Sequence, residues 1–270
     1  MTKLVGIVNL TRDSFSDGGC FLDPKDAIAH ALSLVAQGAD IIDLGAESTH
    51  PDAEDVPAEL EFQRLEPVLH ALRERRVCVS VDTHKPEVMR RVLAAGAGYI
   101  NDVSGFRDPR NVAAVRASDA RLIVMHSRSR SPRAVRDACA SGAILSDIVT
   151  FFERRIESLT NAGVERQRLV LDPGMGFFLS NDASVSVDVL RNFNRLRELE
   201  LPVMVSVSRK SFIGSMLASP QEARVVDQRG AGTLAAELWA ALHGAQLIRT
   251  HDVVALRDAL TVWRAIENSP

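Results

Sequence analysis

The fold is decided by residues 77–105, which read VCVSVDTHKPEVMRRVLAAGAGYINDVSG. The stretch opens on a short apolar run, Val77 to Val81, and closes on a second one, Tyr99 to Ile100. Between them the segment KPEVMRRVLAA has the period of an amphipathic helix. Short runs that are apolar on both faces indicate strands buried in a parallel sheet. The stretch therefore predicts a strand, a helix and a second strand parallel to the first.

The same alternation continues along the whole chain. Eight short apolar or β-branched runs recur: Leu4 to Val8, Ile41 to Leu44, Val77 to Val81, Tyr99 to Ile100, Leu122 to Met125, Leu169 to Leu171, Val203 to Val207 and Leu247 to Ile248. Helical stretches such as DAIAHALSLVAQ and AAELWAALHG separate them, and Gly-Ala steps resembling helix C-caps precede several runs. Eight such units favour a closed (β/α)8 TIM barrel of the α/β class over an open sheet, and we expect one domain spanning residues 1–270.

Composition narrows the classes of partner. Lys plus Arg total 32 against 35 for Asp plus Glu, so the net charge of −3 gives no overall attraction to nucleic acid or to an anionic membrane. No apolar run approaches the roughly 20 residues of a membrane span, and the N-terminal residues lack a secretory pattern. Cys20, Cys78 and Cys139 are dispersed and odd in number, which suggests neither a zinc knuckle nor a disulfide framework. We expect a cytoplasmic protein.

One segment interrupts the alternation of predicted strands and helices. Residues 127–142, SRSRSPRAVRDACASG, are rich in Arg and Ser and interrupt the fifth strand-helix connection. Such charge runs are usually solvated, so the segment is interpreted as a surface loop. Its basic character alone does not support a role in binding nucleic acid.

Polar residues end nearly every apolar run. They are Asn9, Asp43, Asp82, Asn101, His126, Asp172, the Ser208-Arg209-Lys210 group, Arg249 and His251. A single aspartate in such a place is commonly a helix cap or a turn former. In a (β/α)8 barrel, however, all these strand ends face one mouth, where active sites of this fold are built. Their convergence predicts an active site there.

The residue types indicate two subsites within that mouth. Asp82, Asn101 and Asp172 offer the carboxylates and the amide that would bind a flat heterocycle with an amidine-like edge. Positive charge and donors for an anionic group come from Lys210, Arg249 and His251. For Lys210 the alternative of a structural ion pair remains open.

Eight segments, in order, resemble the dihydropteroate synthase family. They are GIVNLTRDSFSDGG, GADIIDLGAESTHPDA, VSVDT, YINDVSG, LIVMH, LDPGMGF, VSVSRKSFIG and IRTHDV. The resemblance implies that the enzyme joins 6-hydroxymethyl-7,8-dihydropterin diphosphate to p-aminobenzoate in folate biosynthesis and releases diphosphate. It also implies an SN1-like displacement, two mobile loops that close over the site, a Mg²⁺ cofactor and a homodimer.

The resemblance also implies roles for particular residues. The diphosphate would contact Asn9, which also meets Mg²⁺, together with Arg249 and His251, while Asp17 would act from the first loop. The pterin ring would be held by Asp82, Asn101, Asp172 and Lys210. The aminobenzoate would lie near Thr49, Ser208 and Phe177. Met125 and His50 are further candidates for substrate binding. No nucleophilic serine or cysteine is required.

The chain departs from the usual family pattern at two places. Ser48-Thr49 is followed by His50-Pro51-Asp52 where the family has Arg-Pro-Gly, and Gly176 is followed by Phe177-Phe178-Leu179 where it commonly has Phe-Gly-Lys. Phe178 should make that wall bulkier. These departures are similar to the Sul-type, sulfonamide-insensitive branch. One hypothesis is that Phe106, or a neighbouring aromatic residue, excludes sulfonamides from the aminobenzoate pocket; plain core packing of Phe106 is the alternative.

Two other functions remain open. A pterin-dependent methyltransferase domain would share the ring contacts but would not be expected to combine the DSFSDGG loop with the SRKS and RTHDV segments. A non-catalytic pterin-binding paralogue is suggested by the altered second loop. Both alternatives share the fold, which is weak evidence of function.

Overall fold

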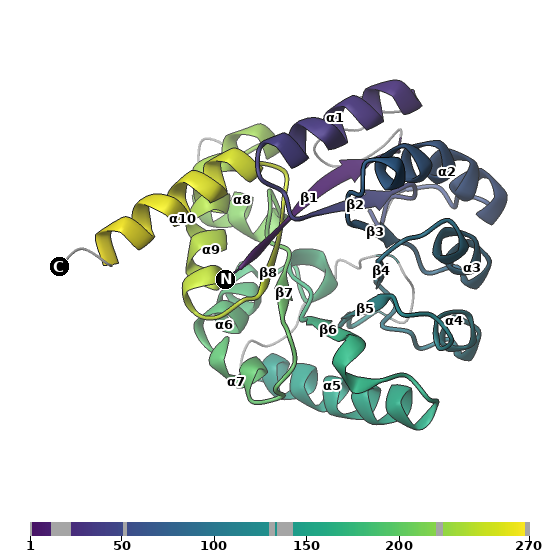
Figure 1. Ribbon diagram of the computed structural model, residues 1–270. Helices are drawn as coiled ribbons and strands as arrows, with labels where there is room; N and C mark the ends of the chain where they lie inside the picture. Colours follow the sequence, from purple (N-terminus) through teal and green to yellow (C-terminus); the bar gives the residue numbers. More distant parts are fainter. Residues whose placement is uncertain are drawn as a thin grey trace.

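Eight parallel strands form one sheet that curls into a barrel (Figure 1). The computed structural model describes residues 2–11, 23–50, 53–129, 133, 143–219 and 224–267. The strands pair in the order β6-β5-β4-β3-β2-β1-β8-β7, and one parallel bridge between Leu171 and Val203 joins the two ends of that series. Their bounds are β1 Lys3–Asn9, β2 Ile41–Gly45, β3 Val79–Asp82, β4 Tyr99–Asp102, β5 Arg121–Met125, β6 Leu169–Asp172, β7 Met204–Val205 and β8 Leu247–Thr250.

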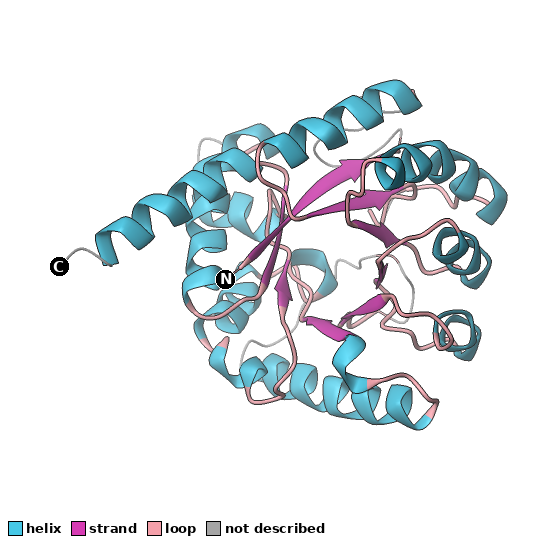
Figure 2. Cartoon of the chain, in the orientation of Figure 1, coloured by secondary structure: helices cyan, strands magenta, loops and turns pink. Residues whose placement is uncertain are grey.

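Helices surround the strands on the outside (Figure 2). They are α1 Pro24–Ala36, α2 Ala58–Glu74, α3 Pro86–Ala94, α4 Pro109–Val115, α5 Ile144–Asn161, α6 Ala183–Arg191, α7 Asn194–Arg197, α8 Ser211–Leu217, α9 Gly230–Leu242 and α10 Val253–Glu267. The predicted (β/α)8 barrel is confirmed. Within the described part of the chain, every helix falls short of the length and apolarity needed to cross a membrane.

The third helix illustrates why these sequences fold as they do. Pro86 occupies the first turn of α3, where a proline costs no hydrogen bond, and Val88 and Val92 lie one turn apart on its buried face. The helix ends before Gly96, whose φ of 101° suits glycine, and the N–H of Ala97 closes the turn by donating to the Val92 carbonyl at 2.9 Å. The predicted Gly-Ala step thus acts as a C-cap.

Alternation along the strands explains how the barrel interior changes from apolar to polar. A cluster of buried side chains, separate from the main core, includes one residue from each of seven strands: Val5, Ile41, Tyr99, Ile123, Val170, Met204 and Leu247. Residues two positions further along a strand point to the same face. Those positions hold Asp43, Asn101, Asp172 and Arg249 among others. The apolar layer therefore fills the lower barrel and the next layer brings polar groups to the mouth.

The structure departs from the predicted strands mainly at the seventh run. Val203 to Val207 was expected to be one strand, but β7 comprises only Met204 and Val205. All five residues are buried, so the apolar pattern marks burial rather than a continuous hydrogen-bonded ladder. Beyond β7 the chain turns into the pocket and passes through Arg209, which has a positive φ of 56°. Most of the predicted 127–142 loop lies outside the described residues.

Candidate active site

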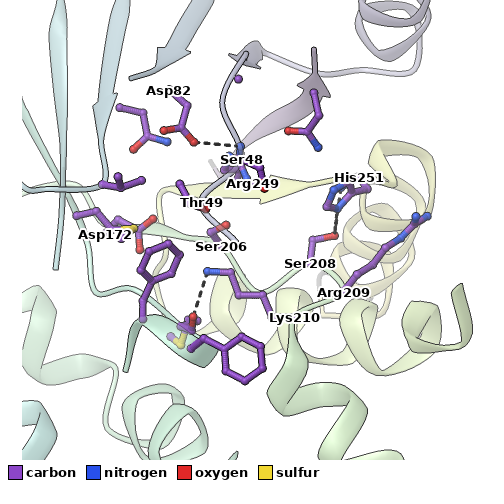
Figure 3. Close-up of a pocket in the computed structure, with 18 of the residues that line it drawn as sticks. Ser48, Thr49, Asp82, Asp172, Ser206, Ser208, Arg209, Lys210, Arg249 and His251 are labelled. Carbon is purple, nitrogen blue, oxygen red and sulfur yellow. Dashed lines mark hydrogen bonds and ion pairs between the residues drawn. The ribbon is translucent and has the colours of Figure 1, made fainter. Parts of the chain in front are cut away.

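A pocket opens at the carboxyl ends of the strands, where the sequence placed it, with about 1080 Å³ of empty space including its open mouth. Eleven of the predicted site residues line it: Asn9, Thr49, Asp82, Asn101, Met125, Asp172, Phe177, Ser208, Lys210, Arg249 and His251. Figure 3 shows the acids Asp82 and Asp172 on one side, Ser208 and His251 on the other, and Lys210 between them. Residues from all eight strand ends thus meet at one site.

The acidic side of the pocket combines two carboxyl groups and one amide. Asp172 is 2% exposed and accepts a hydrogen bond from the Gly174 N–H at 2.8 Å, and burial raises its pKa. Burial also raises the pKa of Asp82 to about 8, with a further contribution from the negative charge of Asp43. The buried Oδ1 of Asn101 has no partner among the described residues. This side therefore holds acceptors that a ligand with several N–H groups could satisfy.

Arg249 lies between two carboxyl groups. Its Nε donates to Asp43 Oδ2 at 2.6 Å, and its Nη2 lies 3.6 Å from Asp82 Oδ2. Asp43 is only 1% exposed and does not line the pocket, so it supports Arg249 from below. Sequence reasoning noted Asp43 as a polar strand end but assigned it no role. The sequence could have indicated this supporting role, because Asp43 lies inside β2, two residues before the end of the strand.

Lys210 reaches across the pocket. Its Nζ donates to the Met175 carbonyl at 3.3 Å and lies 5.2 Å from the centre of the Phe178 ring. Burial lowers its pKa to about 8, and the negative charge of Asp172 opposes that shift. Among the described residues Lys210 forms no salt bridge within 4.0 Å, and its ammonium faces the pocket, which favours a binding role over a purely structural ion pair.

Ser208 and His251 are joined on the side opposite the acids. The Ser208 hydroxyl lies 2.9 Å from the His251 Nδ1 and accepts the backbone N–H of the same histidine at 3.2 Å (Figure 3). Arg209, next to Ser208, also lines the pocket. The His251 ring, the Ser208 hydroxyl and the neighbouring Arg209 together supply donors suited to an anion.

The loop after β2 is anchored from below. Lys85 Nζ donates both to Glu47, which lines the pocket, and to Glu61 Oε2 on α2 at 2.6 Å. Glu47 in turn accepts the Val56 N–H at 3.2 Å. These bonds fix the segment that carries Thr49 to the barrel. Sequence reasoning missed Glu47 and Lys85, because charged side chains between elements look like surface residues until the fold brings them together.

Besides Asp43, three predicted residues do not line the pocket. Phe106 is fully buried, with a φ of 54°, and its carbonyl accepts a hydrogen bond from Arg155 Nη2 at 2.5 Å. Its position corrects the hypothesis that its ring shapes the pocket and favours the core-packing alternative. Phe177 and Phe178 are the aromatic residues that line the pocket.

His50 is half-buried outside the lining. His126, expected at the mouth, packs instead against Phe151 with ring centres 5.1 Å apart.

Other predictions fall outside the described residues. Asp17 of the first loop lies there, as do Pro51-Asp52, Cys20 and Cys139. The described residues contain no group of three or more His, Cys, Asp or Glu side chains arranged to hold a metal ion. A cation at Asn9 would consequently need oxygen ligands from a bound substrate and from water, which is the usual coordination of Mg²⁺ beside phosphates.

Comparison with known proteins agrees with this geometry. The family model described as "Pterin binding enzyme" matches residues 5–251. Dihydropteroate synthase type-3 of Escherichia coli is 45% identical over 98% of this chain and 100% of its own length. The Xanthomonas albilineans dihydropteroate synthase solved with 4-aminobenzoic acid superposes with a TM-score of 0.88 at 41% identity, covering 100% of this chain and 94% of that one. The Yersinia pestis dihydropteroate synthase solved with a sulfonamide drug superposes with a TM-score of 0.90 at 34% identity, covering 100% and 95%.

The barrel and its pocket of acids and cations thus define a pterin-binding enzyme. Identity at this level, over nearly the full length of both chains, narrows the class further. The chain belongs to the dihydropteroate synthase family. This confirms the resemblance seen in the sequence, whereas a particular closeness to the Sul-type branch stays a prediction.

Proposed function

We propose that this chain condenses 6-hydroxymethyl-7,8-dihydropterin diphosphate with p-aminobenzoate to give 7,8-dihydropteroate and diphosphate. The observation that carries this proposal is the meeting of Asp82 and Asp172 with Lys210, Arg249 and His251 in one pocket. The diphosphate ester of a pterin carries both a flat ring with several N–H donors and an anionic group, so it matches the two sides of this pocket. The names of the relatives favour this function over a methyltransferase.

On the acidic side, Asp82, Asn101 and Asp172 would accept hydrogen bonds from the pterin edge. Both carboxyl groups are desolvated, and burial raises the pKa of each. Donors from the ring would replace the lost water, so binding should favour the ionised acids. Lys210 would donate to the opposite edge, and Met125 would pack against the face of the ring.

On the cationic side, Arg249 and His251 would bind the diphosphate and stabilise its charge as the carbon-oxygen bond breaks. Asn9 would hold Mg²⁺, which, when bound to diphosphate oxygens, supplies further charge neutralisation. Arg249 is held rigidly by Asp43 at 2.6 Å, so the charge is already in position. The amine of p-aminobenzoate then attacks the carbon, and its released proton leaves with water or diphosphate.

The acceptor would lie beside Phe177, with its carboxylate near Thr49 and Ser208. Support comes from their shared presence in the pocket lining and from the anchoring of the Thr49 segment through Glu47 and Lys85. His50 lies just beyond this wall. Asp17, which belongs to the first loop, completes the proposed set of catalytic residues.

The test is turnover by the purified protein. Incubation with both substrates and Mg²⁺ should release one diphosphate for each dihydropteroate formed. Binding of the pterin without release of diphosphate would instead identify a non-catalytic paralogue. Complementation of a folate-auxotrophic strain, on plates with and without sulfonamide, extends the same test to the cell.

We also propose that the aromatic wall lowers sensitivity to sulfonamides. Phe178 is only 9% exposed and stands where the family commonly has glycine, and together with Phe177 it narrows the aminobenzoate side. Phe178→Gly should lower the inhibition constant of sulfamethoxazole, while the matched core variant Phe106→Leu should not. Equal inhibition of wild type and Phe178→Gly would remove the idea.

A homodimer in the cytoplasm is the proposed assembly and location. Trp239 on α9 and Val262 and Ile266 on α10 are large apolar side chains with exposures of 46%, 60% and 71%. Apolar surface of this kind commonly marks a protein contact. Light scattering after size exclusion should give twice the chain mass, and Ile266→Glu should reduce that mass.

A further inference from the structure

A buried histidine directly after β5 has no role in the reaction described above. His126 follows Met125, the residue of β5 that pairs with Asp172 of β6 in the parallel ladder. It is 4% exposed, and its ring packs against Phe151 outside the pocket lining. The residue nevertheless lies beside one of the two acids that line the pocket.

His126 contacts three consecutive residues of the turn that follows β6. Its backbone N–H donates to the Asp172 carbonyl at 2.8 Å, and its ring Nδ1 lies 3.3 Å from the Pro173 carbonyl oxygen. Its own carbonyl oxygen packs against Gly174, where an added Cβ would lie only 2.3 Å away. One residue of the neighbouring strand therefore holds the whole Asp172-Pro173-Gly174 turn.

The same turn fixes the carboxyl of Asp172. The Gly174 N–H donates to its Oδ1 at 2.8 Å. Among the described residues no other hydrogen bond reaches this carboxyl, so Oδ2 is left for a ligand in the pocket (Figure 3). A shift of Gly174 would move the donor and turn the carboxyl with it. The place of the turn therefore decides where Asp172 points.

The acceptor determines which nitrogen of the His126 ring carries the proton. A carbonyl oxygen can only accept, so the hydrogen bond to Pro173 requires the proton on Nδ1. Burial lowers the pKa of the ring to about 4; the bond to Pro173 opposes that shift, and the positive charges of Arg107 and Arg128 add to it. The ring is therefore neutral at pH 7, with its single proton on Nδ1.

We propose that His126 is a positioning residue, which donates Nδ1–H to Pro173 and so holds the turn in the place where Asp172 presents Oδ2 to the pterin ring. This rests on the proposed function in one respect, namely that Asp172 accepts hydrogen bonds from that ring. The contact with Phe151 keeps the His126 ring in place, but the donor sets the affinity for the pterin.

Two variants separate the donor from the packing. His126→Asn loses the ring but keeps a donor, because the amide nitrogen of asparagine can take the place of Nδ1. His126→Phe keeps a ring that can pack on Phe151 but has no donor. The probe is 6-hydroxymethylpterin, which carries the ring without the diphosphate, and calorimetry measures its binding. Its affinity should fall about fivefold in His126→Phe and less than about twofold in His126→Asn, as expected for one hydrogen bond.

The matched control is Phe151→Leu, which removes the packing partner and leaves the donor in place. Its melting temperature should fall, while its affinity for the pterin should stay within about twofold of the wild type. Inorganic diphosphate should bind all these proteins alike, because its proposed site lies on the other side of the pocket. In an Asp172→Ala background, His126→Phe should cause no further loss of pterin affinity, since the histidine acts through that carboxyl.

The ring proton is measured on the wild type itself. In protein labelled with ¹⁵N-histidine, with the signal assigned from His126→Asn, the proton should lie on Nδ1 at pH 7. A ring protonated on Nε2 would overturn the inference, and this measurement requires neither turnover nor a folded His126→Phe variant.

The outcomes distinguish this inference from the proposed function. Equal pterin affinity in the wild type and His126→Phe, or an equal loss in His126→Phe and His126→Asn, would overturn the inference even in an active enzyme. An inactive wild type whose variants follow the expected order of pterin affinity would instead refute the proposed function while supporting the role of His126.

Discussion

Replacing Asp82 by asparagine should stabilise the free protein while removing its activity. The side chain is 19% exposed and lies 3.6 Å from Arg249, yet burial raises the pKa of its carboxyl from 3.8 to about 8. A folded-state pKa above the unfolded value means that the folded protein binds the proton more tightly. Stability is therefore lost as pH rises from about 4 to about 8, as the ionised group becomes confined to the pocket.

The size of the effect follows from the pKa. Between pH 5 and pH 8 the wild type can lose about 1.4 kcal/mol of unfolding free energy for each pH unit. Three units set an upper bound of about 4 kcal/mol on this loss. Water reaches part of the side chain, so we expect Asp82→Asn to gain about 2 kcal/mol on the wild type over this interval. Urea unfolding at pH 5 and pH 8.5 measures the difference.

The matched control is Asp258→Asn, because that carboxyl is 60% exposed on α10. It should change the free energy of unfolding by less than about 0.5 kcal/mol at either pH. An Asp82→Asn protein that is less stable than the wild type, by the same amount at both pH values, would refute the reasoning. Such a result would mean that the carboxylate stabilises the fold and is not held in the pocket for its ligand.

Three further predictions concern the walls of the pocket. Gly174→Ala should lower the free energy of unfolding in urea by about 3 kcal/mol, because the added Cβ would lie 2.3 Å from a backbone oxygen at a φ of 69°. The control is Gly163→Ala, which has a φ of 89° but open space around it and should lower the free energy of unfolding by only about 1 kcal/mol. Lys210→Gln should lower kcat/KM about a hundredfold, since its ammonium faces the pocket, whereas Lys25→Gln on the exposed start of α1 should not. Asp43→Asn should raise the KM for the pterin diphosphate about tenfold, because it removes the charge that holds the Arg249 guanidinium at 2.6 Å.

Each of these predictions has an outcome that contradicts it. Equal costs for the two glycine variants would mean that the chain around Gly174 can shift to admit a methyl group. Full activity of Lys210→Gln in steady-state assays would return that lysine to a structural role. An unchanged KM in Asp43→Asn would show that Arg249 needs no carboxylate beneath it.

Strand periodicity accounts for what the sequence could predict. Parallel strands buried on both faces have a distinct apolar pattern, and the position just after each run marks the mouth of the barrel. The periodicity therefore places Asp82, Asn101 and Asp172 in one pocket. Family resemblance added the residues on loops, such as Thr49 and Phe177, which periodicity does not reach.

Other features depended on contacts between distant residues. Phe106 has the residue type of a pocket wall, but its position in the core depends on a turn with positive φ and on Arg155, 49 residues away. His126 follows a strand as Asp82 does, yet the ring turns away from the mouth to pack on Phe151. Glu237 looks like an ordinary helix glutamate, but tertiary packing leaves it only 1% exposed. Such orientations follow from tertiary packing, which short-range patterns do not encode.

The single bridge between Leu171 and Val203 has a consequence for how this barrel can vary. At its seven other junctions neighbouring strands share ladders of paired residues, whereas β6 and β7 meet at one point. The segments that follow these two strands carry Phe177, Phe178 and Lys210, which form the far wall of the cavity. Substitutions in these two segments would therefore change the wall of the cavity with little loss of sheet hydrogen bonding.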